Sequence, residues 1–297
     1  MKKVSVFILM IMLTLPSMAQ EKTATNAAVV ATQAGVASVN SLIKNSNPQT
    51  KFPHGLQFGV GVSPTSGLNG FIGYNNKKFN SFWAKRFGVR FDFASYSPIK
   101  NRLNTKINES IGEEGIKIED NLNIEDISLD AKHYGLLVDF YPFGDTWFLG
   151  GWRLSGGYVK GKLDLDAKIH GKNVGGDIEF ELNGVKYKYT GGEMRGTVDS
   201  DWKYKGPYAG LGFDLGIFRG FKIFMDAGVV FADKPAQIGL DVPLTDLVDA
   251  DGNSVAGNET LINLFNANKE AELRKAQDEM DKYPYYPLVK LGFMYRF

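Results

Sequence analysis

The last thirteen residues of the chain alternate between two kinds of side chain. From Tyr285 to Phe297 every odd-numbered residue is apolar or aromatic, whereas the even-numbered positions hold both charges of the segment, Lys290 and Arg296. A period of two indicates a β-strand, because successive side chains of a strand point to opposite faces. The segment therefore predicts a C-terminal strand with one uncharged face and one face that carries charge.

The same alternation recurs in seven earlier segments. They span residues 55–63, 67–75, 86–95, 132–143, 151–169, 206–216 and 220–232. Each has an apolar face opposite a face of glycine, polar or charged residues, which predicts eight strands in all. In the segment 151–169 the apolar positions change parity between Tyr158 and Leu163, and this change predicts a bulge near Lys160 and Gly161.

The distribution of charge decides which face of these strands is the interior. The apolar faces run without charge for about 9 to 11 residues, the length that a tilted strand needs to cross a bilayer. The opposite faces carry Arg90, Asp92, Asp139, Arg153, Asp214, Lys222 and Asp226, besides the two charges of the last strand. Charges in the dry core of a soluble barrel are costly unless paired. We therefore predict an all-β fold, a transmembrane antiparallel up-and-down barrel of eight strands with these charges in its lumen.

The connections between the predicted strands support this architecture. Long connections at residues 96–131, 170–205 and 233–284 alternate with short ones. Outer-membrane barrels have short periplasmic turns and long external loops, so the long connections are expected outside the cell. Residues 259–283 have apolar side chains at helical spacing and pairs of opposite charges, which predicts a helix against the barrel rim in the last external loop.

A barrel of ten strands is the alternative. It requires residues 181–192 and 195–204 to form a further hairpin inside the membrane. Four lysines crowd these segments, namely Lys186, Lys188, Lys203 and Lys205. Because a charged side chain on the lipid face is destabilising, we expect the two segments to extend strands five and six outside the membrane instead.

The N-terminus indicates export. Residues 1–19 contain two lysines, an apolar run from Val4 to Leu15 and a small-residue site ending at Ala19, which is the order of a secretory signal peptide. We expect cleavage after Ala19. Residues 20–53 are then a periplasmic N-terminal arm and linker, helical over 24–44, and residues 54–297 form the barrel. Export of a membrane barrel predicts the outer membrane of a Gram-negative cell.

Composition excludes several kinds of partner and chemistry. The net charge is +1 and no basic stretch stands out, so nucleic acid is not an expected partner. The chain has no cysteine, which excludes thiol chemistry and a lipoprotein anchor. The three histidines, His54, His133 and His170, belong to no recognisable nucleophile motif. We therefore expect no enzymatic activity, no cofactor and no metal.

The segment 246–254 resembles the start of a calcium loop, with Asp249, Asp251 and Asn253 at alternate positions. A loop of that kind needs an acidic residue at its twelfth place, where Thr260 stands. An ordinary Asp-Gly turn is therefore the expectation.

Aromatic residues gather near both ends of the predicted strands. Near the short turns lie Trp83, Trp147, Phe148, Trp152, Phe218, Tyr295 and Phe297, and toward the long connections lie Tyr96, Trp202, Tyr204, Tyr283 and Tyr285. Two such bands are typical of the interfacial girdles of membrane barrels.

Two resemblances follow from these segments. The ending Phe293, Tyr295 and Phe297 resembles the sorting signal of Gram-negative outer-membrane barrels, which implies the barrel-assembly machinery as a partner during biogenesis. The stretches GLLVDFYPF, GWRLSGGYVKGKLDLDA, GPYAGLGFDLG, GFKIFMDAGVVFADKPAQIGLDV and YYPLVKLGFMYRF resemble, in this order over residues 135–297, a family of uncharacterised small outer-membrane β-barrel proteins. That resemblance implies a barrel surrounded by outer-membrane lipid. It implies no activity, because one fold hosts many functions.

Three functions stay open at the level of sequence. Because the interior of an eight-stranded barrel is normally filled by side chains, the inward charges favour a plugged barrel with a structural or surface-interaction role. An apolar lumen with an opening in the wall would instead favour a channel for small or hydrophobic solutes. A cluster of histidine, serine and an acid at the rim would favour a lipid-modifying enzyme. Any surface ligand of the external loops is unknown.

Overall fold

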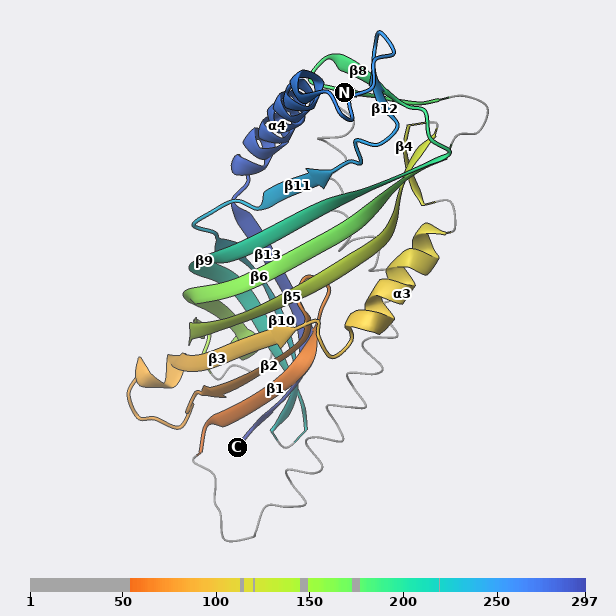
Figure 1. Cartoon of the computed structure of the whole chain (residues 1–297). Coiled ribbons are helices and arrows are strands. Elements are labelled where there is room, and N and C mark those ends of the chain that lie inside the picture. Colours follow the sequence, from red (N-terminus) through yellow and green to blue (C-terminus); the bar gives the residue numbers. More distant parts are fainter. Residues whose placement is uncertain (1–53, 113–114, 120, 145–148, 173–176, 219) are drawn as a thin grey trace.

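The computed structural model of the chain describes residues 54–112, 115–119, 121–144, 149–172, 177–218 and 220–297. The predicted signal peptide, the N-terminal arm, Trp147 and Phe148 lie outside these residues. Antiparallel strands dominate the described part, and two α-helices accompany them (Figure 1). Neither of these helices is long and apolar enough to cross a bilayer.

Eight strands form a closed ring, as the sequence predicts. They are β1 (Leu56–Ser63), β2 (Gly67–Tyr74), β3 (Phe87–Ser95), β5 (Leu122–Phe140), β6 (Trp152–Lys172), β9 (Glu193–Phe218), β10 (Phe221–Phe231) and β13 (Tyr285–Arg296). Each strand pairs antiparallel with the next one in this order, and β13 pairs with β1 to close the ring. Since all eight coincide with alternating segments of the sequence, the eight-stranded barrel is confirmed.

The first and last strands meet in a regular register. Phe58 lies opposite Tyr295 and Val60 lies opposite Phe293. Beyond the strands, the amide of Gly55 donates to the carbonyl oxygen of Phe297 at 2.8 Å, and the amide of Phe297 donates to that of Leu56 at 2.9 Å. Both ends of the barrel sequence therefore lie at the same rim.

Short and long connections alternate around the ring, as predicted. Residues 75–86, 141–151 and 219–220 connect strands at what we call the short-turn end, which also holds the two short 3-10 helices η1 (Ala84–Arg86) and η2 (Leu149–Gly151). Residues 96–121, 173–192 and 232–284 connect strands at the opposite, long-connection end. The turn at residues 64–66 is the short exception at that end.

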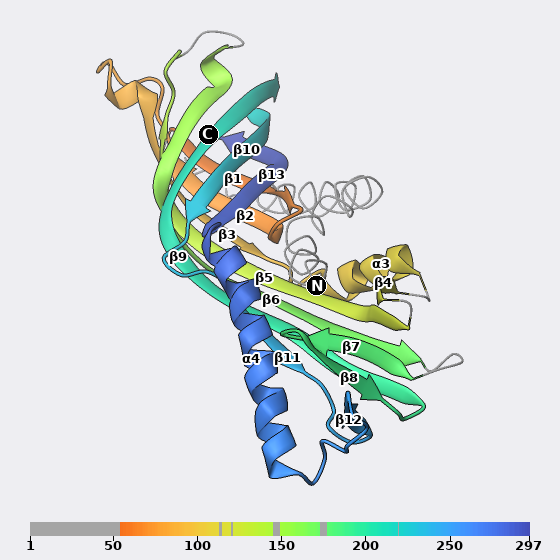
Figure 2. The same ribbon diagram turned by 90° about the horizontal axis from the view of Figure 1, so that it is seen from above.

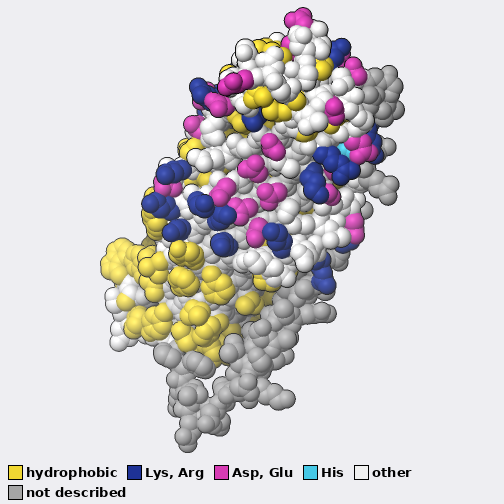
Figure 3. Space-filling model, viewed as in Figure 1, with side chains coloured by type: hydrophobic (Ala, Val, Ile, Leu, Met, Phe, Trp, Pro, Cys, Tyr) yellow, Lys and Arg dark blue, Asp and Glu magenta, His cyan; other side chains and the backbone are white. Residues whose placement is uncertain are grey.

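Side chains on the ring alternate between the lumen and the outer surface. The outer positions of the short-turn half carry large exposed apolar residues, among them Leu136, Met225 and Phe91, which are 63%, 54% and 48% exposed. Figure 3 shows, on the face that it views, hydrophobic side chains gathered over the short-turn half of the molecule. Because a soluble protein rarely exposes so large an apolar area, this surface has the character of a lipid-facing band.

The bulge predicted near Lys160 and Gly161 is absent, because β6 pairs with β9 in one unbroken register. Even-numbered residues point outward throughout the strand. The apolar positions change parity because the surroundings of the strand change along its length. Beyond Tyr158 the outer face becomes charged, and the inner face, from Leu165 onward, packs into an apolar core. The change of parity therefore marks where β6 leaves the apolar band.

Three strands continue well beyond the rest of the ring. β5, β6 and β9 are 19, 21 and 26 residues long, whereas β1 and β2 have 8 residues each. The short strand β4 (Ile116–Glu119) pairs with β5, and β11 (Gln237–Asp241) pairs with β9. Figure 1 shows this sheet, which we call the extension, rising from the barrel toward the long-connection end.

The extension carries further structure on its inner face. α3 (Lys100–Ile111), which the sequence did not predict, packs on β5 through Ile107. A second sheet of β7 (Ile178–Leu182), β8 (Val185–Tyr189) and β12 (Leu247–Asp249) packs with α4 (Glu259–Asp281) around the fully buried Phe265. We call β7, β8, β12 and α4 the cap. Both views place α3 and the cap at opposite edges of the extension (Figures 1 and 2).

The long-connection end corrects two details of the predictions. Residues 195–204 extend the sixth ring strand, as expected, but residues 181–192 belong to the separate cap sheet rather than to an extension of the fifth. The predicted helix is present as α4, and it rests mainly on β11 and β7, while Met280 in its last turn joins the apolar cluster of Tyr204 and Tyr286 at the barrel rim. α4 also contacts β8, since the side-chain amide of Asn268 donates to the hydroxyl of Tyr187 at 2.9 Å.

The aromatic bands agree with the prediction at one end only. Near the short turns Trp83, Trp152 and Phe218 are exposed on the outer surface, and at the other end Tyr283 and Tyr285 are exposed too. The remaining three residues of the second band, Tyr96, Trp202 and Tyr204, are buried instead. Trp202 and Tyr204 occupy inward positions of β9, where they pack against Tyr286.

Candidate functional site: the ion-paired lumen

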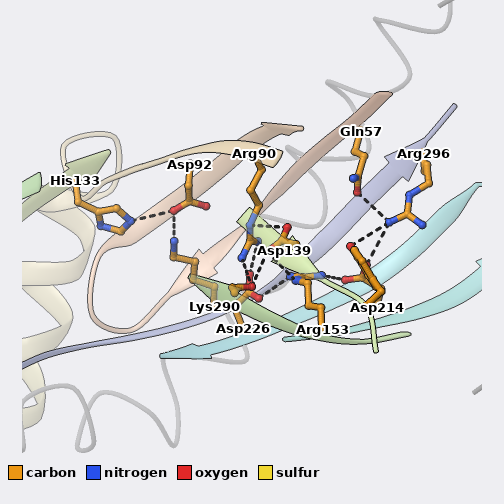
Figure 4. A network of polar contacts seen from close by, with 12 residues as sticks. Gln57, Arg90, Asp92, His133, Asp139, Arg153, Asp214, Asp226, Lys290 and Arg296 are labelled. Atoms are coloured by element: carbon orange, nitrogen blue, oxygen red, sulfur yellow. Dashed lines mark hydrogen bonds and ion pairs between the residues drawn. The ribbon is translucent and has the colours of Figure 1, made fainter. Parts of the chain in front are cut away.

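Six of the seven candidate lumen residues converge inside the ring. Arg90, Asp92, Asp139, Arg153, Asp214 and Asp226 are each 4% exposed or less. They come from β3, β5, β6, β9 and β10, at positions where the alternation turns each side chain inward. The seventh, Lys222, lies half-buried near the start of β10. Figure 4 shows five of them, Arg90, Asp139, Arg153, Asp214 and Asp226, joined in one chain of polar contacts, and Asp92 beside them in contact with Lys290 and His133.

Asp226 lies at the centre of this network. Its two carboxylate oxygens accept hydrogen bonds from Arg90 Nη1 at 2.7 Å and from Arg153 Nη2 at 2.6 Å. Arg90 Nε lies 3.2 Å from an oxygen of Asp139, and Arg153 Nη1 also pairs with Asp214. Two arginines are thus held among three aspartates, and charge-assisted hydrogen bonds of this kind are the strong ones.

Further ion pairs and hydrogen bonds lie toward both rims. At the long-connection side Asp92 pairs with Lys290 of β13, and His133 Nε2 lies 3.3 Å from the same carboxylate. At the short-turn side Arg296 Nη2 donates to Gln57 Oε1 at 3.1 Å. Tyr141 links Arg296 to Asp214 at that rim. Its hydroxyl donates to Asp214 at 3.0 Å and accepts from Arg296 at 3.2 Å.

Charge is balanced within this set. Four basic residues, Arg90, Arg153, Lys290 and Arg296, stand with four acidic ones, Asp92, Asp139, Asp214 and Asp226. Lys290 and Arg296 were recognised in the sequence as charges of the inner face. Tyr141 was not, because only charged residues of the inner face were candidates, although its odd position continues the inward series of residues 132–143.

Glycine makes room for the centre of the network. A Cβ atom at Gly212 of β9 would lie 2.5 Å from Arg153 Nε and 2.5 Å from Asp226 Oδ1. Since real Cβ atoms do not approach other atoms so closely, only glycine lets the two side chains meet at this point. A residue that reads in sequence as part of a glycine-rich strand is therefore a component of the site.

Apolar and aromatic side chains lie in the lumen on either side of the charged residues. Phe71 and Phe224 meet edge to face with ring centroids 5.2 Å apart, and Met294 packs with them. Toward the long-connection end the rings of Tyr204 and Tyr286 lie 4.5 Å apart, and the Tyr286 hydroxyl donates to the carbonyl of Thr65. Side chains thus occupy the lumen at both of these levels and at the charged level.

The histidines lie in separate surroundings. His133 contacts Asp92 inside the ring, whereas His170 Nδ1 lies 3.1 Å from Glu125 in the extension, and His54 is exposed. In the part of the chain that the structure describes, no three His, Asp or Glu side chains are placed to hold a metal ion. Asp249 accepts hydrogen bonds from the amides of Asp251 and Asn253 at 3.0 and 2.8 Å, the geometry of an ordinary turn.

The residues of the predicted assembly signal lie at the seam of the ring. Phe293 and Tyr295 are on the outer face of β13, and Phe297 follows directly after it. The ring of Tyr295 packs edge to face on Phe221 of β10 at 4.8 Å, and that of Phe297 does so on Phe58 of β1 at 6.0 Å. Their recognition by the assembly machinery remains a prediction.

Comparisons with known proteins bear on the fold. No family model matches the chain, and no curated protein matches it in sequence. Among solved structures, it is similar to Acinetobacter baumannii CarO, with a TM-score of 0.50 and 16% identity over 82% of this chain and 98% of CarO. It is also similar to CarO2 of the same organism, with a TM-score of 0.50 and 14% identity over 83% of this chain and 100% of CarO2. Both neighbours are outer-membrane β-barrels. With its closed eight-stranded ring and apolar outer band, this chain has the fold of an outer-membrane β-barrel protein.

Proposed function

We propose that this chain is an exported outer-membrane protein whose barrel conducts no solute, with a structural or surface-interaction role in the cell envelope. The observation that carries the proposal is the ion-paired network across the lumen. Arg90, Arg153 and Asp226 come from three different strands of the ring and hold one another by contacts of 2.6 to 2.7 Å.

The balance of charge supports a plug rather than a conduit. Rings of a single sign of charge line the selectivity regions of many pores. Here four acids and four bases alternate and neutralise one another, and all but Arg296 are fully buried. Solute passage would require breaking several buried ion pairs, each costly to separate in surroundings of low polarity.

The long-connection end supports a role at a surface. The extension, α3 and the cap rise beyond the apolar band, and the cap has its own core of buried apolar residues. On the prediction that this end is external, the protein presents a folded unit to the outside rather than loose loops. A folded surface is the feature expected of a protein that contacts other envelope components.

Single-channel conductance in a planar bilayer tests the proposal. The detergent-purified protein is first shown to be folded by its heat-modifiable mobility on a gel. We expect a conductance no larger than background. Two variants of β5 serve as a matched pair, Asp139→Asn in the lumen network and Asp130→Asn, whose side chain is partly exposed and lies 3.6 Å from Lys100.

Each outcome is decisive. A steady conductance that changes in Asp139→Asn and not in Asp130→Asn would make the lumen a transport path and overturn the plug. A conductance that both variants leave unchanged would also contradict the proposal, because it would show an aqueous path that bypasses the network. Background conductance in all three proteins is the result that the ion-paired lumen predicts.

A further inference from the structure

A row of lysines borders the apolar band on the outer face of the extension. Lys160 follows the outward-facing Tyr158 on β6, and Lys205 precedes the outward-facing Pro207 on β9. Two residues along a strand are about 7 Å apart, so the backbone positions of Lys160 and Lys205 lie about 7 Å from those of the last apolar residues, Tyr158 and Pro207. Figure 3 shows the blue side chains gathered directly along the edge of the hydrophobic surface.

Cross-strand pairing sets these lysines directly opposite one another. Lys160 faces Lys205, while Lys162 faces Lys203 on one side and Lys132 on the other. Like charges directly opposite in a sheet destabilise it. Repeating this arrangement across three strands has a cost that a bound anion would remove.

The lysines line a single open pocket. It has a volume of about 710 Å³ and is bordered by Lys132, Lys160, Lys162, Lys203, Lys205 and Lys234, together with Asp201 and Asp233. Six ammonium groups against two carboxylates give the pocket an excess of positive charge. The volume lies within the range of small-molecule sites and is far larger than one phosphate ion requires.

Only half of these lysines have a carboxylate partner. Lys162 lies 2.8 Å from Asp164, Lys203 lies 3.1 Å from Asp201, and Lys205 lies 3.8 Å from Asp233. The ion pair with Asp164 raises the pKa of Lys162, so its charge persists at neutral pH. Among the residues that the structure describes, Lys132, Lys160 and Lys234 have no carboxylate within 4.0 Å. These three are available to a ligand.

Acidic residues lie on the side away from the band. The next row along the strands brings together Asp130, Asp164 and Asp201, which face one another as the lysines do. An anion is therefore attracted at the level of the lysines and repelled one row further out. This order fits a charge that is attached to the lipid layer better than an anion free in solution.

We propose that these boundary lysines bind the phosphate groups of an anionic lipid, whose acyl chains lie along the adjacent apolar band. The proposal rests on the placement of the barrel in the outer membrane made above. Phosphates of a bilayer lie at the junction of headgroup and acyl chain, which is where the lysines stand relative to the band. The pocket then accommodates the remainder of the headgroup.

Native mass spectrometry of the folded, detergent-purified protein tests this site. The probes are bisphosphorylated lipid A, the same lipid after removal of its phosphates, and inorganic phosphate. The test variant is Lys132→Gln/Lys160→Gln/Lys234→Gln. The control, Lys168→Gln/Lys172→Gln/Lys186→Gln, removes three exposed lysines farther along the extension and in the cap.

We expect the protein to bind the phosphorylated lipid more tightly than the other two probes. Each lysine at an anionic lipid surface contributes about a fivefold gain in binding, so the test variant should lose about a hundredfold. The control should lose less than about twofold, because Lys168 lies about 27 Å along the strand from Lys160 and salt screens charges at that distance.

Three results would overturn the proposal. They are an equal loss in both variants, binding of the dephosphorylated lipid as tight as that of lipid A, and binding of inorganic phosphate as tight as that of the lipid. Heat-modifiable mobility identifies a variant that fails to fold, and Lys160→Gln alone then replaces it with a fivefold expected loss. A protein that inserts into planar bilayers but shows one of these results refutes the lysine site only. A protein that fails to insert refutes the membrane placement itself.

Discussion

The substitution Asp226→Asn tests the lumen network at its centre. Asp226 accepts hydrogen bonds from Arg90 and Arg153 at 2.7 and 2.6 Å, and it is 3% exposed. The amide keeps the size of the side chain but removes its charge. One of the two guanidinium groups then faces an NH₂ donor instead of an acceptor. The balanced set of four acids and four bases becomes one with an excess positive charge.

The expected cost follows from the geometry. Removing one partner of a buried ion pair costs about 3–5 kcal/mol, because the other charge stays buried without compensation. We expect a value near the lower end, about 3 kcal/mol, since Asp139 still lies beside Arg90 and Asp214 still pairs with Arg153. Such a loss lowers the ratio of folded to unfolded protein about a hundredfold.

Equilibrium unfolding in urea, in lipid vesicles, measures this loss. The fraction folded is read from heat-modifiable mobility at each urea concentration, and the midpoint of the transition gives the change in free energy. The control is Asp130→Asn, which removes a carboxylate that is partly exposed and 3.6 Å from Lys100. Exposed pairs contribute about 0–1 kcal/mol, so the control should shift the midpoint little.

A second substitution separates charge balance from lost contacts. Arg153→Gln in the background of Asp226→Asn restores neutrality, so we expect the double variant to lose clearly less than the sum of the two single variants. The reasoning fails if Asp226→Asn destabilises the protein no more than the control. It also fails if the double variant shows simple additivity, since that would mean the two side chains act independently.

Three further predictions concern other parts of the molecule. Gly212→Val brings a branched side chain against Arg153, whose Nε lies 2.5 Å from the Cβ position, so the urea midpoint should fall more than in Gly216→Val, where the side chain meets open space. Leu136→Arg puts a charge on the apolar band, where Leu136 is 63% exposed, and should cost about 2–4 kcal/mol in vesicles, whereas a cost below 1 kcal/mol would contradict a lipid-facing position. Phe265→Ala empties the centre of the cap core, and a local cost of about 3–5 kcal/mol should appear as faster hydrogen exchange in β7 and β8 with the barrel unchanged.

The barrel itself was predictable because one physical rule applies along every ring strand. Lipid on one side and charged side chains on the other impose a strict period of two, and residues such as Asp92 and Asp139 stand at the inward positions of that period. The closed ring then follows from pairing eight such segments in order. The same rule predicts inward positions for Lys290 and Arg296, which pair there with Asp92 and with Gln57.

The misread features are those in which the surroundings of a strand change. In β6 the apolar side moves from the outer face to the inner face beyond Tyr158, because lipid outside is replaced by water outside and a core inside. Periodicity reports which face is apolar and not what lies against it, so the change of parity predicts a bulge that the strand does not have. The same limit applies to Trp202 and Tyr204, whose even positions on β9 place them inward although their residue types are typical of interfaces.

The strands of the cap and the helix α3 could not be predicted from periodicity, for a different reason. β7 and β8 are 5 residues long and β12 has 3, too short for alternation to define a partner. Their partners are separated widely in sequence, as with Tyr187 and Phe265, whose rings meet at 5.1 Å. α3 has few apolar residues, and its Asn104 and Asn108 contact β5 by hydrogen bonds to the backbone at 3.1 and 2.9 Å. Such contacts leave no periodic trace in the sequence.

The unequal length of the ring strands has a mechanical consequence. Three strands, β5, β6 and β9, run without interruption from the barrel into the extension that carries the cap. The cap is therefore attached rigidly to the barrel and not through a flexible linker. A pull on the cap is delivered as tension along β5, β6 and β9, in the half of the wall with the longest hydrogen-bonded ladders. A second route is the three-residue link from α4 to β13, which delivers part of the load to the seam where β13 meets the 8-residue β1. Force applied at the surface therefore tilts the barrel as one body, because it enters both the long-strand wall and the closing seam.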